Sequence, residues 1–150
     1  MSLEEKVMSL MKEAMKSKDE ATLRGLRAIK AEIIKAKTDP GANGVISEDT
    51  ELKLLQKLVK SRKDSLTIYE TQNRPDLAAK EIEEIAVIEK FLPAQMSEEE
   101  VKTAVQAIIA TLGAAGPQDL GKVMGAATKQ LAGQADGKLI SAVAKALLTA

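Results

Sequence analysis

The sequence predicts an all-α fold that is divided into two helical domains. Apolar residues recur at spacings of three and four along each long segment, the periodicity of a helix that packs one face against a core. No segment alternates apolar and polar residues as a half-buried strand does. Aromatic residues are limited to Tyr69 and Phe91, so the cores must be aliphatic, as in small helical bundles. Pro93 marks the expected boundary between an N-terminal antiparallel bundle, residues 1–92, and a C-terminal three-helix domain, residues 93–150.

Two helices are expected before the first break in the chain. Residues 3–16 place apolar side chains at helical spacing. Asp19 is a candidate N-cap for a second helix that runs to about Lys37. Gly25 lies inside that helix, where glycine costs about 1 kcal/mol relative to alanine, and close helix packing is the expected reason for it. The segment 39–44, rich in Gly with one Pro, predicts a loop.

A long third helix and a fourth helix are expected to complete the first domain. Ser47 is followed by two acidic residues, which favour a helix start because acids interact well with the positive end of the helix dipole. The apolar pattern then continues to about Gln72. Asn73 and Pro75 predict the end of this helix and the start of the next, since proline suits a first helical turn. The fourth helix is expected to continue toward Leu92.

The second domain is expected to begin with a well-capped helix. The segment from Ser97 to Glu100 fits a capping box, and Met96 with Val101 is placed to form a hydrophobic staple. This helix should end at Leu112, before a glycine-rich break at residues 113–117. Two shorter helices then complete the chain.

The composition excludes several kinds of chemistry. The chain has no Cys and no His, which removes thiolate nucleophiles, Cys/His zinc sites and histidine acid–base catalysis. Carboxylate pairs such as Glu83 and Glu84 are interpreted as solvated helix surface. We therefore predict no catalytic residue, no metal site and no cofactor. No apolar run approaches the roughly 18 residues of a membrane span, and the N-terminus lacks the apolar stretch of a signal peptide, so we expect a cytoplasmic protein with no membrane partner.

The formal charge is zero, with 22 basic and 22 acidic residues. Charge is uneven on a finer scale, because residues 101–150 hold five lysines against Asp119 and Asp136. This mild basic bias is far from the strongly basic character of a general nucleic-acid binder, and DNA binding is not expected.

The segment from Asp119 to Leu148 carries an internal repeat with an offset of sixteen residues. Residues 121–132 and 137–148 agree at five of twelve positions. Asp119 and Asp136 are candidate N-caps. The matched pairs are Gly121/Gly137, Lys122/Lys138, Ala126/Ala142, Lys129/Lys145 and Leu131/Leu147.

Two interpretations of this repeat stand side by side. A lysine in a first helical turn opposes the helix dipole, an arrangement that suits an anion bound beside free backbone N–H groups. Lys129 and Lys145, seven residues further on, fall nearly on the same helix faces. The alternative is tight helix packing, since Gly121–Gly125 and Gly133–Gly137 have the spacing of small residues at close helix contacts.

The repeat is not a nucleotide-binding loop. Val123 follows Gly121-Lys122 where a P-loop has Ser or Thr, so nucleotide hydrolysis is not expected. No aromatic residue follows Phe91, which excludes base stacking by the second domain. Nucleic-acid binding there would have to use shape, backbone phosphates and 2′-hydroxyls, as suits structured RNA.

A secondary basic face is expected on the third helix. Its simplest interpretation is a solvated surface with local ion pairs, for example between Lys60 and Asp64 and between Asp49 and Lys53. The alternative is a track for RNA phosphates. The candidate residues are Lys53, Lys57, Lys60, Arg62 and Lys63.

Three parts of the chain together resemble the GatB/YqeY family, in the order and spacing of its stand-alone YqeY-like members. They are KSRKDSL with NRPDLA at 60–66 and 73–78, FLPAQMSEEE at 91–100, and DLGKVMGA with ADGKLI at 119–126 and 135–140. The last part also resembles the C-terminal domain of the GatB subunit of the glutamine-dependent aspartyl/glutamyl-tRNA amidotransferase. In that enzyme the domain helps to hold tRNA.

This resemblance implies an all-helical fold with a tail domain, and it implies RNA-binding positions in the second domain. Gln134 departs from the family, which often has Lys or Arg there. This departure removes one potential contact to phosphate, so weak to moderate binding is expected. The chain of 150 residues leaves no room for the kinase and transamidase region of the amidotransferase. The candidate RNA-binding residues are Gly121, Lys122, Gly125, Lys129, Gly133, Asp136, Gly137, Lys138 and Lys145.

Three functional hypotheses follow. The first is a non-catalytic tRNA-binding or tRNA-amidotransferase-related accessory module, whose partners are tRNA or another structured RNA and tRNA-processing or aminoacylation proteins. The second is a component of a glutamine-dependent carbon–nitrogen ligase assembly. The third is a helical protein-interaction module without RNA binding.

Overall fold

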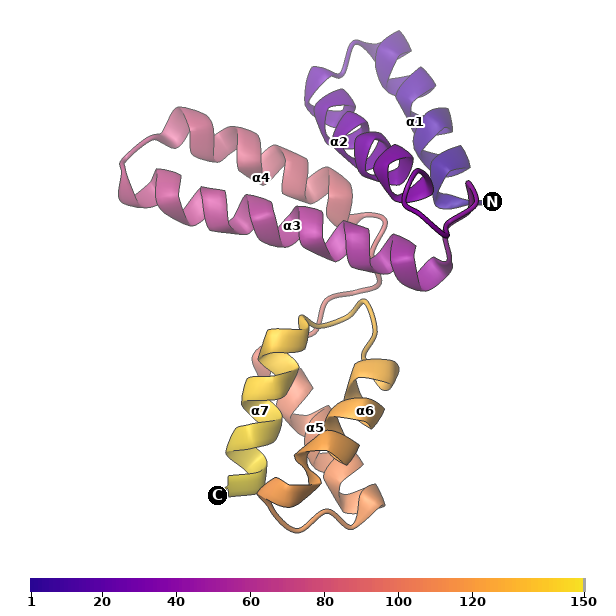
Figure 1. Cartoon of the computed structure of the whole chain (residues 1–150). Coiled ribbons are helices and arrows are strands. Elements are labelled where there is room, and N and C mark those ends of the chain that lie inside the picture. The colour runs from indigo at the N-terminus through magenta and orange to yellow at the C-terminus, as the bar shows by residue number, and fades with distance from the viewer. Residues whose placement is uncertain (150) are drawn as a thin grey trace. The chain divides into compact units, whose positions relative to one another are not determined.

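A computed structural model describes residues 1–149 of the chain. Within that range the protein is helical and contains no strand, which confirms the predicted all-α class (Figure 1). The chain divides into two compact units, an N-terminal unit of Met1–Leu92 and a C-terminal unit that begins at Pro93. The helices are α1 (Leu3–Ser17), α2 (Glu20–Lys37), α3 (Glu48–Thr71), α4 (Pro75–Glu89), α5 (Glu98–Leu112), the 3₁₀ helix η1 (Pro117–Asp119), α6 (Leu120–Gln130) and α7 (Gly137–Thr149).

Most helix starts follow the predicted capping signals. The Asp19 carboxylate accepts a hydrogen bond from the Thr22 N–H at 3.1 Å, and the Ser47 hydroxyl accepts one from the Thr50 N–H at 3.2 Å. The hydroxyl and N–H of Thr22 together hold the pKa of Asp19 below its usual value. The reciprocal capping box over Ser97–Glu100 is also present. Local sequence therefore determines where these helices begin.

The breaks between helices fall where the sequence predicts them. Gly41 and Gly44 have φ values of 90° and 75° in the loop between α2 and α3, a conformation that glycine adopts without steric cost. Asn73 has φ 56° between α3 and α4, and Pro75 occupies the first turn of α4. The 3₁₀ helix η1 was not predicted.

The N-terminal unit consists of two helical hairpins, α1 beside α2 and α3 beside α4 (Figure 1). One aliphatic cluster joins them, and α2 contacts α1, α3 and α4. The largest fully buried side chains of this cluster are Val7, Leu26, Ile29, Ile33, Leu55 and Ile88.

Gly25 allows a close contact between α2 and α4. A Cβ atom at this position would lie 2.8 Å from both Cβ and Cγ1 of Val87, which is well inside van der Waals contact. Gly25 is buried, and Val87 is only 7% exposed. The predicted packing role of Gly25 is confirmed, because no other residue leaves room for Val87.

A charged cluster links α2, α3 and α4 beside this contact. Arg24 forms ion pairs with Glu83 at 2.6 Å and with Glu84 at 3.8 Å, and Arg62 pairs with Glu84 at 3.4 Å. The side chains of Arg62 and Glu84 are each only 18% exposed. Burial and the neighbouring Glu84 raise the pKa of Glu81. Our interpretation of Glu84 as solvated surface was wrong, since this carboxylate serves two arginines from other helices.

The C-terminal unit is a three-helix arrangement around a second aliphatic cluster. α5, α6 and α7 each contact the other two. Val101, Val105, Val123, Ala127 and Ala144 are fully buried at its centre. Small side chains predominate here, so the three helices can pack closely with no aromatic residue between them.

We predict opposite effects of alanine at two helical glycines. Gly25→Ala gains helix propensity of about 1 kcal/mol, but it places a methyl group against Val87 at a cost of about 1–3 kcal/mol. Gly125→Ala gains the same propensity, and nothing lies within 4 Å of its new Cβ atom. Urea unfolding should therefore show a less stable Gly25→Ala variant and a more stable Gly125→Ala variant. Val87→Ala should relieve the first defect, and equal stabilisation by both glycine substitutions would contradict the packing role.

We also predict that Arg62 stabilises the fold while Lys57, on the exposed side of the same helix, does not. Arg62→Met leaves the half-buried Glu84 with a single, more distant arginine and should cost about 1–3 kcal/mol in unfolding free energy. Lys57→Met alters an exposed side chain and should change stability by less than about 0.5 kcal/mol. Adding Glu84→Gln to each variant measures the coupling. No coupling between positions 62 and 84 would mean that this ion pair carries no stability.

Candidate nucleic-acid interface

The solvent-facing side of α6 carries the first half of the repeat. Val123 and Ala127 are fully buried, so the opposite side of the helix faces solvent. Because residues seven apart lie nearly on one helix face, the two lysines of α6 share that side. The exposed candidates are Gly121, Lys122, Gly125 and Lys129.

α7 repeats the same arrangement. Ala144 is fully buried and Ile140 is 1% exposed, while Gly137, Lys138 and Lys145 are exposed. Across the described part of the chain, no carboxylate lies within ion-pair distance of any of the four repeat lysines. Their ammonium groups are therefore available to an external anion.

The exposed glycines do not serve packing among the described residues of the C-terminal unit. Apart from its chain neighbours and the backbone of its own helix, a Cβ atom added to Gly121, Gly125 or Gly137 would meet no described atom within 4 Å. The tight-packing interpretation is wrong for these three positions, because no helix of the C-terminal unit approaches them. Their effect is to leave helix backbone uncovered beside the lysines, so that an external molecule can come close to the main chain.

Gly133 has a different role from the other repeat glycines. It lies in the loop between α6 and α7, is buried, and has φ 76°. Its carbonyl oxygen accepts a hydrogen bond from the Gln95 side chain at 2.7 Å, and the next carbonyl, of Gln134, accepts one from the Met96 N–H at 2.9 Å. Gly133 therefore shapes a loop that holds the segment before α5, and it is not part of the exposed surface.

The aspartate N-caps that the sequence predicts are absent at the start of α6 and weak at the start of α7. Asp119 stands at the start of α6 but does not cap it, since its carboxylate accepts a hydrogen bond from the Ala115 N–H at 2.9 Å. The Leu120 N–H donates to the Pro117 carbonyl in η1. The Asp136 carboxylate accepts a long hydrogen bond, 3.5 Å, from the Lys138 N–H. An aspartate thus stands at the start of each helix, where its negative charge opposes a bound anion, and the lysine side chains are the cationic groups beside it.

The structure divides the secondary basic face on α3. Lys53, Lys57, Lys60 and Lys63 are exposed, but Lys53 pairs with Asp49 at 2.9 Å and Lys63 pairs with Glu89 at 3.4 Å. Arg62 lies on the opposite side of the helix and donates to the Leu58 carbonyl and to Glu84. Lys57 and Lys60 have no carboxylate partner among the described residues, so the expected Lys60–Asp64 ion pair is not formed. With two of its lysines paired, this surface is less available than the one on α6 and α7.

Residues 1–149 offer neither a metal centre nor a membrane span. No group of three or more His, Cys, Asp or Glu residues there could hold a metal ion. No helix among these residues has both the length and the apolar character that crossing a membrane requires.

Comparison with known proteins identifies the family. The profile of the family described as Yqey-like protein matches residues 4–148, a range that includes every candidate position on α6 and α7. A relative from Pyrenophora tritici-repentis (strain Pt-1C-BFP), named altered inheritance of mitochondria protein 41, mitochondrial, is 30% identical over 135 residues. These residues cover 87% of this chain and 72% of the relative. Both findings agree with the resemblance seen in the sequence, and the chain belongs to the Yqey-like protein family.

Proposed function

We propose that the C-terminal unit binds tRNA or another structured RNA and that the protein acts as a non-catalytic accessory module. One observation carries this proposal. α6 and α7 each carry two exposed lysines that are seven residues apart and have no carboxylate partner among the described residues. Three glycines on the same helices leave helix backbone uncovered near these lysines.

The chemistry of this surface favours contacts to the sugar–phosphate backbone. Lysine ammonium groups bind phosphate oxygens as point charges. A helix surface without Cβ atoms lets a ribose or phosphate approach more closely than a surface covered by side chains. The unit has no aromatic residue, so shape and 2′-hydroxyl contacts, not base stacking, would provide selectivity for RNA.

The charge balance limits the affinity of such a complex. The chain has a formal net charge of zero, so long-range attraction to RNA is small and the few lysine contacts provide most of the electrostatic free energy. Weak to moderate, strongly salt-dependent binding is consistent with an accessory role beside tRNA-processing or aminoacylation proteins. The proposed compartment is the cytoplasm, which suits a chain without disulfides.

A specific observation also favours a protein-interaction module. Gly121 and Gly125 are four residues apart on α6, and nothing covers either of them. Small residues at this spacing let a partner helix pack closely. Such docking buries mainly apolar surface and would depend little on the four lysines or on salt.

The first test of RNA binding removes the charges of two repeat lysines. Replacing Lys122 and Lys138 with Ala should weaken tRNA binding and flatten the plot of log affinity against log salt by about 0.9 for each phosphate that the variant no longer neutralises. Mobility shift across a salt series measures both quantities. The matched control replaces Lys12 and Lys16, two exposed lysines of α1, and should leave the slope unchanged. Identical slopes for wild type and the Lys122/Lys138 variant would rule out a role for these lysines.

The second test changes shape without changing charge. Gly125→Leu should fold at least as stably as wild type, because leucine is a good helix former and nothing within 4 Å opposes its Cβ atom. The longer side chain should nevertheless hold RNA away from α6 and reduce tRNA affinity several-fold. Unchanged affinity would show that the uncovered backbone is not used. A loss of binding to a protein partner, with RNA affinity intact, would support the protein-interaction module instead.

A further inference from the structure

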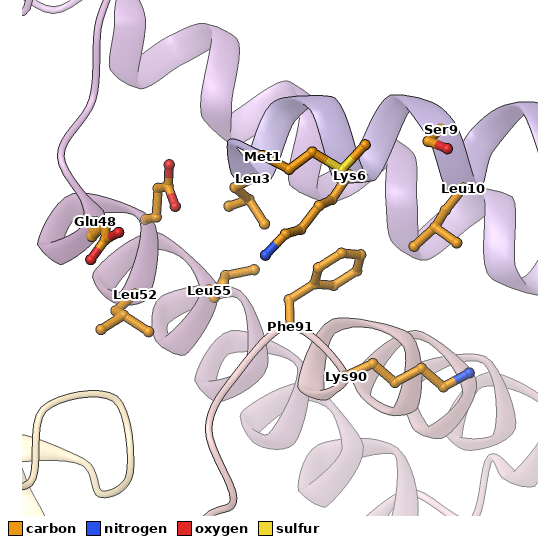
Figure 2. A pocket seen from close by; sticks show the side chains of 11 residues that line it. Met1, Leu3, Lys6, Ser9, Leu10, Glu48, Leu52, Leu55, Lys90 and Phe91 are labelled. Carbon is orange, nitrogen blue, oxygen red and sulfur yellow. The ribbon is translucent and has the colours of Figure 1, made fainter.

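The N-terminal unit contains a pocket that RNA binding by α6 and α7 does not use. Its volume is about 590 Å³, within the range of small-ligand sites. α1, the start of α3 and the residues just after α4 form its walls (Figure 2). The apolar lining comes from Met1, Leu3, Leu10, Leu52, Leu55 and Phe91.

The floor of this pocket belongs to the stable core. Leu3 is 6% exposed and Leu55 is 2% exposed, so their positions are set by packing in the unit as a whole. Phe91, the only phenylalanine of the chain, packs partly buried against the same cluster. Figure 2 shows its ring beside the Lys6 side chain. An apolar ligand group would therefore meet a preformed aliphatic and aromatic surface.

The polar groups at the rim carry opposite charges on different helices. Lys6 extends from α1 toward α3, while Glu48 lies at the start of α3 (Figure 2). Glu51, one turn further along α3, also lines the pocket. Lys90 also lines the pocket, but its side chain extends away from Lys6 (Figure 2) and its charge also acts on Asp19.

These rim charges are unpaired although their neighbours are paired. On α1, Glu4 forms an ion pair with Lys37, and on α3, Asp49 forms one with Lys53. Within the described residues, Lys6, Glu48 and Glu51 have no ion-pair partner. The pocket lining thus holds two lysines, Lys6 and Lys90, and two glutamates, Glu48 and Glu51, and no ion pair joins them among the described residues.

We propose that this pocket binds a small zwitterion with an apolar body, of the class of apolar amino acids and short apolar peptides. Its carboxylate pairs with the Lys6 ammonium, and its ammonium group pairs with Glu48 and Glu51. Its apolar side chains rest on Leu3, Leu55 and Phe91. A purely anionic amphiphile fits less well, because the two glutamates would repel it, and a purely cationic one would meet Lys6.

The ligand test uses the dipeptide L-leucyl-L-leucine and two analogues that each lack one charge. Titration of the ¹⁵N-labelled full chain, followed by NMR, should give saturable shifts at residues 3–10, 48–55 and 91. The N-acetyl analogue and the C-terminal amide should each bind at least tenfold more weakly. Equal binding of all three ligands, or shifts elsewhere only, would overturn the proposal.

Matched variants separate the two charge contacts. Lys6→Met keeps most of the length of the side chain but removes its charge, so it should weaken binding of the dipeptide and leave the weak binding of the amide analogue unchanged. Glu51→Gln should have the reciprocal effect, with the N-acetyl analogue unaffected. Ser9→Trp fills the pocket from an exposed position and should abolish binding of every ligand. Lys12→Met, also exposed on α1 but outside the pocket lining, should bind as wild type, and a loss of binding there equal to that of Lys6→Met would contradict a specific contact.

Discussion

The contact between the Gly25 backbone and Val87 constrains the whole N-terminal unit. α2 touches every other helix of the unit, so its distance from α4 determines where the two hairpins meet. A methyl group at position 25 would already lie 2.8 Å from Val87, and dense interiors cannot absorb such an overlap without moving helices. The ion pairs from Arg24 and Arg62 to Glu84 connect α2, α3 and α4. Packing and charge therefore fix how α2, α3 and α4 lie against one another. The pocket that Phe91 lines is built in part on α3 and on the residues just after α4.

The C-terminal unit uses glycine for the opposite purpose. Gly25 is enclosed by a neighbouring helix, whereas Gly121, Gly125 and Gly137 face open space. A helix that tolerates exposed glycine gives up about 1 kcal/mol of propensity at each internal site, and packing inside the unit does not compensate for this. The lysines beside these glycines also lack carboxylate partners among the described residues. Exposed glycines lower the stability of α6 and α7, and unpaired lysines on the same helix faces add none. An external partner that binds these faces explains both features better than folding does.

The sequence was sufficient for features that depend on local chemistry. Helix starts at Ser47 and Ser97 followed from capping, and the fold class followed from apolar periodicity. Other features were missed. The carboxylate of Asp119 fits an N-cap by sequence, yet it bonds to Ala115 because η1 already occupies the helix start. Arg62 is nine positions from Lys53, and helical periodicity places it on the other side of α3. The sequence alone could therefore have excluded Arg62 from the basic face. The pocket beside Lys6 brings together segments about 85 residues apart, which no spacing rule predicts.

Contact of structured RNA with the uncovered helix faces of α6 and α7 is tested most directly by NMR mapping of backbone amides. The ¹⁵N-labelled full chain is titrated with tRNA at low and at moderate salt. We expect salt-sensitive shifts or broadening centred on Gly121, Gly125 and Gly137, with smaller effects at Lys57 on α3. An RNA complex whose perturbed amides lie on α3 or elsewhere in the N-terminal unit, with these three glycines unaffected, would contradict the proposed interface.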